Sequence, residues 1–374
     1  MKREFKVTPY EVSGAVDYNR IVKEFGVEFI TSDLLKRIEK ISGEPHFMLK
    51  RGIFFAQRDI KWILDEYEKG NKFFLYTGRA PSGKIHVGHL MPWIFTKWLQ
   101  DKFDVDLWFQ FPNEEKFLFK KEMTFELAQS FLQDNMLDVI ALGFDPKKTF
   151  FIVDTIHANL MYEEACKVAK RITLSMVKSS FGLDDQTNIG VIFYTSMQAV
   201  PAFLPSILKN KNIPCLIPHG VDQDPHFRLT RDILPKLGHY KPASIQCSFL
   251  PPLSGTQGKM SSSKETEAIY TSDSPEIIKK KINKYAFSGG KDTIEEHRKK
   301  GGNPDIDVSF QYLRYIFEPD DKKLAKIEKE YRSGALLTSE LKKILIEKIS
   351  SFLSEHQKRK EQAKKDIDKF ILKC

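Results

Sequence analysis

The sequence predicts an α/β protein in which a Rossmann-like parallel sheet with a helical insertion is followed by an all-helical part. Short apolar runs that suit buried parallel strands alternate with amphipathic stretches up to about residue 270. Beyond that point only the spacing of helices is found. We therefore expect an N-terminal segment (1–70), a sheet domain (71–270) with its insertion at 120–200, and a helical domain (271–374).

The composition is that of a globular chain, with 41% hydrophobic and 29% charged residues. No run of about 18 apolar residues exists, so we expect no membrane helix, and the first residues, MKREFKVTPYEV, contain no apolar signal core. The cysteines form no CxxC pair, which predicts neither a zinc site nor a disulfide framework and favours the cytoplasm (Cys166, Cys215, Cys247 and Cys374).

The positive charge is concentrated near the C-terminus. The net charge of the chain is +9, and from Pro275 onward 24 basic and 17 acidic residues contribute +7 of it. A basic surface of this kind attracts polyanions. We therefore expect any nucleic acid to bind the helical domain.

The stretch 72–99 predicts a phosphate site. An aromatic run at 73–76 reads as a buried strand, and an amphipathic helix follows a glycine-containing loop. The start of such a helix favours phosphate because its N–H groups are unpaired. His86 and His89 face this point and can donate to phosphoryl oxygens, while Gly88 lets a flat ligand approach the backbone.

Further strands are expected at 105–111, 149–153, 214–217 and 244–249. In open α/β sheets, ligands bind outside the carboxyl ends of the strands. We expect the polar residues at the ends of the first two strands to share one crevice with the histidines (Tyr76, Gln110, Glu115 and Lys116). Asp222 and Gln223 follow the strand at 214–217, at the entry of a helix.

A second motif lies far downstream. Residues 255–263 read GTQGKMSSS, a glycine-flanked loop that carries Lys259 and three hydroxyl groups. The pair of stretches PSGKIHVGH and KMSSS, in this order, resembles the HIGH and KMSKS signatures of class I aminoacyl-tRNA synthetases.

Longer stretches resemble tryptophanyl-tRNA synthetases of the archaeal and eukaryotic type. They are KRGIFFAQRD, LYTGR, HVGHLMPWIFTKWLQD, CLIPHGVDQDPHFRLTRD and AFSGGKDTIEEHRKKGGNPDIDVSFQYL. The resemblance implies a catalytic domain at 71–270 and an anticodon-binding domain at 271–374. It also implies ATP-dependent activation of L-tryptophan and transfer to tRNA(Trp), with Mg²⁺ carried by ATP, no metal ligand from the protein and no zinc.

The resemblance assigns roles residue by residue. Charge on the phosphates would be stabilised by His86, His89 and Lys259. ATP would be bound by Thr77, Gly78, Arg79, Gly88, His89, Gln223, Lys259, Met260, Ser261 and Ser262. Tryptophan would be bound by Tyr76, Gln110, Glu115, Lys116, Gln198 and Gln223.

Recognition of tryptophan requires an acceptor, because the indole N–H can only donate. Tyr76 and Gln110 match the family positions that receive it, and Glu115 with Gln198 suits the α-ammonium. A site built for that N–H discriminates against phenylalanine by up to about 10⁴- to 10⁵-fold.

Other implied features concern the loop, the tRNA and the assembly. Ser262 stands where the KMSKS signature normally has its second lysine, and Lys264 follows one place beyond the motif. Lys291 and Asp292 of the SGGKD stretch are expected to face anticodon bases. The family also implies a homodimer that packs through the insertion, and residues 7–12 resemble a segment that folds over the active site.

Two other functions remain open from the sequence. A tyrosyl-tRNA synthetase shares the fold and both signatures, but that family typically pairs a tyrosine with an aspartate in its side-chain pocket. A catalytically silent paralogue that binds tRNA or serves as a scaffold is expected to lose His86, His89 or Lys259, and all three are present.

Overall fold

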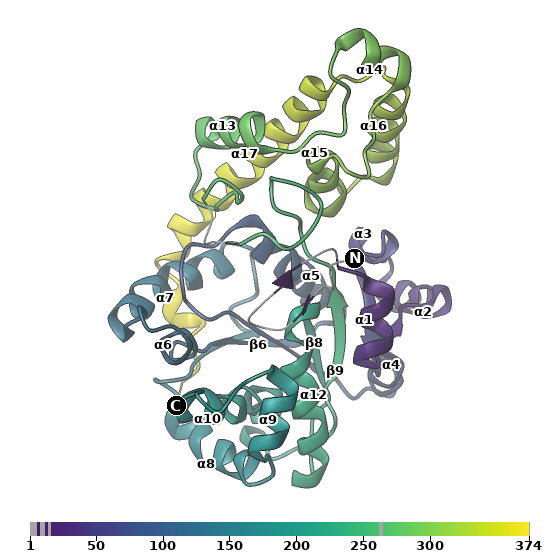
Figure 1. Cartoon of the computed structure of the whole chain (residues 1–374). Coiled ribbons are helices and arrows are strands. Elements are labelled where there is room, and N and C mark those ends of the chain that lie inside the picture. Colours follow the sequence, from purple (N-terminus) through teal and green to yellow (C-terminus); the bar gives the residue numbers. More distant parts are fainter. Residues whose placement is uncertain (1–5, 8–11, 14–15, 262–264, 374) are drawn as a thin grey trace.

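The centre of the molecule is a seven-stranded sheet with the strand order β3-β4-β9-β8-β5-β6-β7 (Figure 1). The computed structural model describes residues 6–7, 12–13, 16–261 and 265–373. The strands of the sheet are β3 (Glu28–Phe29), β4 (Phe54–Arg58), β5 (Phe74–Gly78), β6 (Asp106–Phe111), β7 (Thr149–Val153), β8 (Cys215–Gly220) and β9 (Ala243–Cys247). A separate antiparallel pair is formed by β1 (Lys6–Val7) and β2 (Val12–Ser13).

Strands β9, β8, β5, β6 and β7 pair with one another in parallel. The chain leads outward from β5 through β6 to β7 and then returns to β8 on the other side of β5. A topological switch point therefore lies between β5 and β8, which is where open α/β sheets bind ligands. The expected strand at 149–153 is found at those residues, and the other four parallel strands lie within a few residues of their predicted bounds.

The sheet also contains two strands that the sequence did not predict. β4 pairs with β9 and β3 pairs with β4, both antiparallel. The N-terminal segment therefore extends the sheet in addition to packing beside it. β4 carries the polar residues Gln57 and Arg58, which are buried and find partners in Glu28 and Asp224.

Helices cover both faces of the sheet, because alternate side chains of each strand point to opposite faces. Leu75 and Leu107 join one core, whereas Phe74 and Trp108 join the other. The first core is covered by α2 (Ser32–Ser42), α3 (Phe47–Lys50), α4 (Ile60–Glu68), α5 (Val87–Phe103) and α7 (Phe125–Ile140). The second is covered by α8 (Ala158–Ala169), α10 (Ile189–Met197), η1 (Val200–Ala202), α11 (Leu204–Leu208) and α12 (Asp224–Ile233).

The expected insertion at 120–200 is not made of helices alone, since β7 lies within it. Two helices follow β7 in this region: α8 ends at Ala169 and α9 (Leu174–Phe181) begins after Thr173. The Thr173 hydroxyl caps α9 by accepting the Met176 N–H at 3.3 Å. The short helix α6 (Glu115–Phe119) follows β6, while α1 (Tyr18–Phe25), η2 (Val221–Gln223) and η3 (Leu234–Leu237) complete this part.

The part after residue 270 is helical, and its last helix returns to the sheet (Figure 1). It contains α13 (Pro275–Tyr285), α14 (Ile294–Lys300), α15 (Val308–Tyr312), the π-helix η4 (Leu313–Phe317), α16 (Asp321–Ser333), α17 (Thr338–Ala363) and η5 (Ile367–Lys369). On α17, which is yellow in Figure 1, His356 bonds Asp138 of α7 at 2.8 Å. Residues 370–372 then pair with Phe151 at the free edge of β7. Among the described residues, no helix is long and apolar enough to cross a membrane.

Candidate active site

A cavity of about 230 Å³, open to solvent, lies at the carboxyl ends of β5, β6, β8 and β9. It is therefore at the switch point of the sheet. Its lining brings together most of the residues that the sequence singled out: Thr77, Gly78, Arg79, His86, Gly88, His89, Gln110, Glu115, Lys116, Gln198, Asp222, Gln223, Lys259 and Met260.

The two histidines lie at the start of α5. The backbone N–H of His86 donates to Nδ1 of His89 at 3.2 Å, and the two rings stack with their centroids 3.6 Å apart. Burial, together with the nearby Arg79, lowers the pKa of both imidazoles well below its usual value. Both rings are therefore neutral near pH 7 and act as hydrogen-bonding groups rather than as cations.

Arg79 supplies positive charge to the cavity. Its backbone N–H donates to the Gln110 carbonyl at 2.8 Å, which fixes the loop after β5. Two of its guanidinium nitrogens, Nε and Nη2, are buried without an acceptor among the described residues. Burial lowers its pKa to about 10, so the side chain stays charged. A buried cation with unused donors is suited to an anionic ligand.

Glycines let the backbone come close at this site. A Cβ on Gly78 would lie 2.7 Å from the Gln110 carbonyl oxygen, which a real side chain cannot do. A Cβ on Gly88 would lie 3.1 Å from the His86 ring and 3.6 Å from Cβ of Met260. The two signature stretches therefore touch at Gly88.

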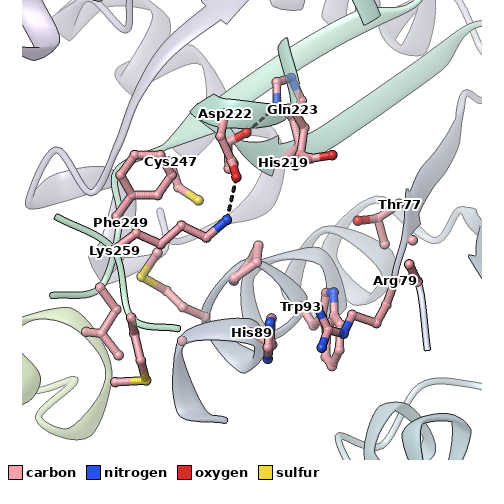
Figure 2. Close-up of a pocket in the computed structure, with 18 of the residues that line it drawn as sticks. Thr77, Arg79, His89, Trp93, His219, Asp222, Gln223, Cys247, Phe249 and Lys259 are labelled. Atoms are coloured by element: carbon pink, nitrogen blue, oxygen red, sulfur yellow. Dashed lines mark hydrogen bonds and ion pairs between the residues drawn. The ribbon is translucent and has the colours of Figure 1, made fainter. Parts of the chain in front are cut away.

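Lys259 approaches from the opposite side of the cavity, as Figure 2 shows. Its ammonium group pairs with the Asp222 carboxylate and lies 5.6 Å from the centre of the Phe249 ring. The backbone of the segment after the loop is joined to the histidine loop, because Val87 N–H donates to the Ile269 carbonyl at 3.0 Å. The lysine and the histidines are therefore held on one framework.

The wall formed by β5 and β6 is a chain of hydrogen bonds. The Tyr76 hydroxyl donates to Oε1 of Gln110 at 2.5 Å and accepts from Nε2 of Gln198 at 2.8 Å. Tyr76 itself is 1% exposed and reaches this wall from behind, whereas Gln110 and Gln198 line the cavity.

An acidic group lies beside this wall. Glu115 forms an ion pair with Lys116, and its Oε2 lies 3.3 Å from the Tyr194 hydroxyl oxygen. Burial opposes ionisation of Glu115, but Lys116 outweighs it and the pKa of the carboxyl is lowered. This end of the cavity therefore has a carboxylate that suits a positively charged ligand group. The other end has positively charged side chains that suit an anionic ligand group.

Comparison with known proteins identifies the family. The family model described as tRNA synthetases class I (W and Y) matches residues 68–354. The chain belongs to this family. A tryptophan–tRNA ligase from Sulfurisphaera tokodaii is 53% identical over 99% of this chain and 96% of its own. One from Pyrococcus furiosus is 47% identical over 99% and 94% of the two chains.

Solved structures of class I synthetases share the architecture. The tryptophanyl-tRNA synthetase of Plasmodium falciparum matches with a TM-score of 0.90 and 42% identity, covering 95% of this chain and 97% of that one. That of Encephalitozoon cuniculi, solved bound to tryptophan, matches with a TM-score of 0.88 and 39% identity over 96% and 98%. These relatives do not favour a tyrosyl-tRNA synthetase or a silent paralogue.

Some residues that the family signatures pointed to lie elsewhere. Ser261 is exposed and does not line the cavity, and Ser262 and Lys264 fall outside the described residues, as does most of the segment 7–12. Lys291 and Asp292 are exposed in the helical part, away from the cavity.

Two polar residues of the site were missed from the sequence. His219 lines the cavity at the end of β8, and its Nδ1 donates to the Gly220 carbonyl at 2.9 Å, so the neutral ring presents Nε2 as an acceptor. Asp154 directly follows β7 and accepts from Nε2 of Gln110 at 2.7 Å. Their place at the carboxyl ends of strands is the signal that could have found them.

Proposed function

We propose that this chain activates L-tryptophan with ATP to give tryptophanyl-adenylate and pyrophosphate, and then transfers the tryptophanyl group to tRNA(Trp). The observation that carries this proposal is one cavity with acceptors at one end and cations at the other. Gln110 presents the acceptor wall, while Arg79 and Lys259 supply the positive charge. The name of its relatives, tryptophan–tRNA ligase, agrees with it.

The first step is an in-line displacement at phosphorus. An oxygen of the tryptophan carboxylate bonds to the α-phosphorus while the bond from that phosphorus to the bridging oxygen of pyrophosphate breaks. No protein nucleophile takes part, so the residues act by positioning the reactants and by stabilising charge. Arg79 and Lys259 supply full positive charges, and the neutral His86 and His89 can donate hydrogen bonds.

Lys259 has to change partners in this step. Its ammonium group pairs with Asp222, and phosphate oxygens would compete with that carboxylate for it. Released from Lys259, Asp222 is free to accept from a ribose hydroxyl. Thr77, Gly78, Gly88, Gln223, Met260 and the loop serines Ser261 and Ser262 would complete the ATP site.

Tryptophan fits the other end of the cavity. Oε1 of Gln110 has one lone pair engaged by Tyr76 and a second left to accept the indole N–H. Glu115 is ionised beside Lys116 and suits the α-ammonium, with Gln198 next to it. Lys116 and Gln223 lie within reach of the carboxylate end.

Mg²⁺ would enter on the triphosphate as part of the substrate. Among the described residues, no group of three or more His, Cys, Asp or Glu could hold a metal. The carboxylates of Glu115 and Asp222, which line the cavity, are both paired with lysines. We therefore propose that the phosphates, rather than the protein, carry this ion.

The helical part is proposed to bind the anticodon arm of tRNA(Trp). It holds most of the excess positive charge of the chain, and Lys291 and Asp292 are exposed on it. A homodimer is proposed to form through the insertion, where large apolar side chains are exposed (Phe125, Leu127, Ile156, Tyr162, Leu174 and Ile189). A place in the cytoplasm, where translation occurs, and a lid role for residues 7–12 complete the proposal.

The test is exchange of labelled pyrophosphate into ATP, measured with each of the twenty amino acids. We expect exchange with tryptophan alone, and at least about a hundredfold lower kcat in Lys259→Ala, since a preorganised charge of this kind is worth that much. Exchange with tyrosine would overturn the assignment of the Gln110 wall. A folded protein that exchanges with no amino acid would overturn the enzyme.

A further inference from the structure

Asp154 lies behind the wall that is proposed to read the indole. It directly follows β7, is 1% exposed and does not line the cavity. Its Oδ2 accepts from Nε2 of Gln110 at 2.7 Å. Tyr76 is a strand residue of the second core, and Gln110 and Asp154 each stand two residues after one. Because every second side chain of a strand points to the same face, all three side chains lie on one face of the sheet.

This contact decides which end of the Gln110 amide faces which neighbour. A glutamine amide has a donor end and an acceptor end, and rotation by half a turn exchanges them. Oδ2 of Asp154 accepts from this amide, so Asp154 holds the NH₂ end. The carbonyl end is then left for the Tyr76 hydroxyl and for the ligand.

The order continues through the wall. Tyr76 has its hydrogen engaged by Gln110, so it accepts from Nε2 of Gln198. The carbonyl end of Gln198 in turn accepts from the Tyr194 hydroxyl. In each of these hydrogen bonds the donor belongs to the group farther from Asp154. The Asp154 carboxyl group ends the series and so sets the donor and acceptor roles of all its members.

Asp154 is itself held by a second acid. The Glu114 carboxyl group interacts with that of Asp154, and Oδ1 of Asp154 and Oε2 of Glu114 are buried without a donor among the described residues. Burial and the neighbouring Glu114 raise the pKa of Asp154 well above its usual value, and burial raises the pKa of Glu114 to about 7. One proton shared between the two carboxyl groups satisfies both and leaves Oδ2 as an acceptor toward Gln110.

We propose that Asp154 is a positioning residue for amino-acid specificity, because it fixes the Gln110 amide with its carbonyl oxygen available to the indole N–H. The proposal rests on the proposed function and names a residue that acts through Gln110 without touching the substrate. Without this acceptor the amide can turn, and its NH₂ group then meets the indole N–H donor to donor.

The test compares tryptophan with 3-(3-benzothienyl)alanine, in which sulfur replaces the indole N–H. Pyrophosphate exchange is measured with both amino acids for the wild type, Asp154→Leu and Asp154→Asn. Leucine removes the acceptor and keeps the branched outline of the side chain, with two methyl groups in place of the two oxygens. Asparagine keeps it, because its Nδ2 can donate to Glu114 while its oxygen accepts from Gln110.

We expect the wild type to prefer tryptophan in kcat/KM by about 100-fold or more. In Asp154→Leu the preference should fall at least about tenfold, mainly through a higher KM for tryptophan, while the KM for ATP stays within about twofold. Asp154→Asn should retain the preference. Asp154→Ala, which removes the same oxygen, serves if the leucine variant does not fold.

An equal loss of exchange with both amino acids in Asp154→Leu or Asp154→Ala would overturn the proposal, because a merely structural residue affects both alike. Loss of discrimination in Asp154→Asn as severe as in the leucine variant would also overturn it. The result for the wild type distinguishes failure of the proposed function from failure of this inference. If the wild type does not exchange with tryptophan, the proposed function fails, whereas exchange with unchanged discrimination in the variants defeats this inference alone.

Discussion

At the scale of single residues, the cavity contains an arginine whose hydrogen-bond donors are only partly used by the folded chain. Two guanidinium nitrogens of Arg79 are buried and have no acceptor among the described residues. Arg51 provides a contrast: it donates to the carbonyls of Arg314 and Glu318 at 2.7 and 2.8 Å and pairs with Asp321. A satisfied arginine stabilises a fold, whereas an unsatisfied buried one is a cost that a ligand offsets.

We therefore predict opposite effects of two like substitutions on stability. Arg79→Met should raise the free energy of unfolding by about 1–3 kcal/mol and raise the KM for ATP at least about tenfold. Arg51→Met, the matched control, should lower the free energy of unfolding because it leaves three carbonyls without this donor. Urea unfolding and exchange kinetics measure both quantities. A loss of stability in Arg79→Met as large as in Arg51→Met would contradict the prediction.

At the scale of elements, the glycines of the SGGKD stretch are required by packing. A Cβ on Gly289 would lie 2.0 Å from the Asn303 carbonyl oxygen. The Gly289 N–H donates to the buried Asp307 carboxylate at 2.8 Å, which also accepts from the Tyr331 hydroxyl at 2.7 Å. The backbone at Gly289 is thus held against Asn303 and Asp307, and we call this arrangement the clamp.

Gly289→Ala should lower the free energy of unfolding by about 2 kcal/mol or more, because the backbone has to move to admit the methyl group. Gly255→Ala is the control, since a Cβ there meets nothing within 4 Å. Thermal unfolding followed by circular dichroism measures the difference. Equal midpoints for the two variants would refute the clamp.

The parallel strands could be predicted from sequence and the antiparallel ones could not. Apolar runs such as 149–153 carry their own signal, because both faces of a central strand are buried. In β4 the buried residues include Arg58, whose partner Asp224 stands far along the chain. A local pattern does not contain such a partner. The motifs located the cavity because they are local stretches of sequence. The neutral state of His86 and the role of Asp154 could not be predicted, because they depend on burial and on contacts between distant strands.

At the scale of the whole molecule, the exposed apolar side chains of the insertion have to be accounted for. Ile189 is 84% exposed and Leu174 52%, which is unusual for large apolar residues on regular helices. Ile294, in the helical part, is 61% exposed and stands outside the proposed interface. These residues give a direct test of the proposed homodimer.

The wild type should elute with about twice the 43.3 kDa mass of one chain. Ile189→Asp should shift the mass toward the monomer, since it places a charge in the interface, and Ile294→Asp should leave it unchanged. Size-exclusion chromatography with light scattering decides the matter. A wild type with the mass of one chain would refute the homodimer.

The pairing of residues 370–372 with β7 has a consequence for how the chain is made. On the ribosome, β7 leaves the exit tunnel long before the residues that close its outer edge. That edge stays open while the whole helical part is synthesised, and an open edge of β-sheet invites pairing with other chains. Because Asp154 follows this strand directly, the sheet edge beside the Gln110 wall is completed only after residues 370–372 have been synthesised.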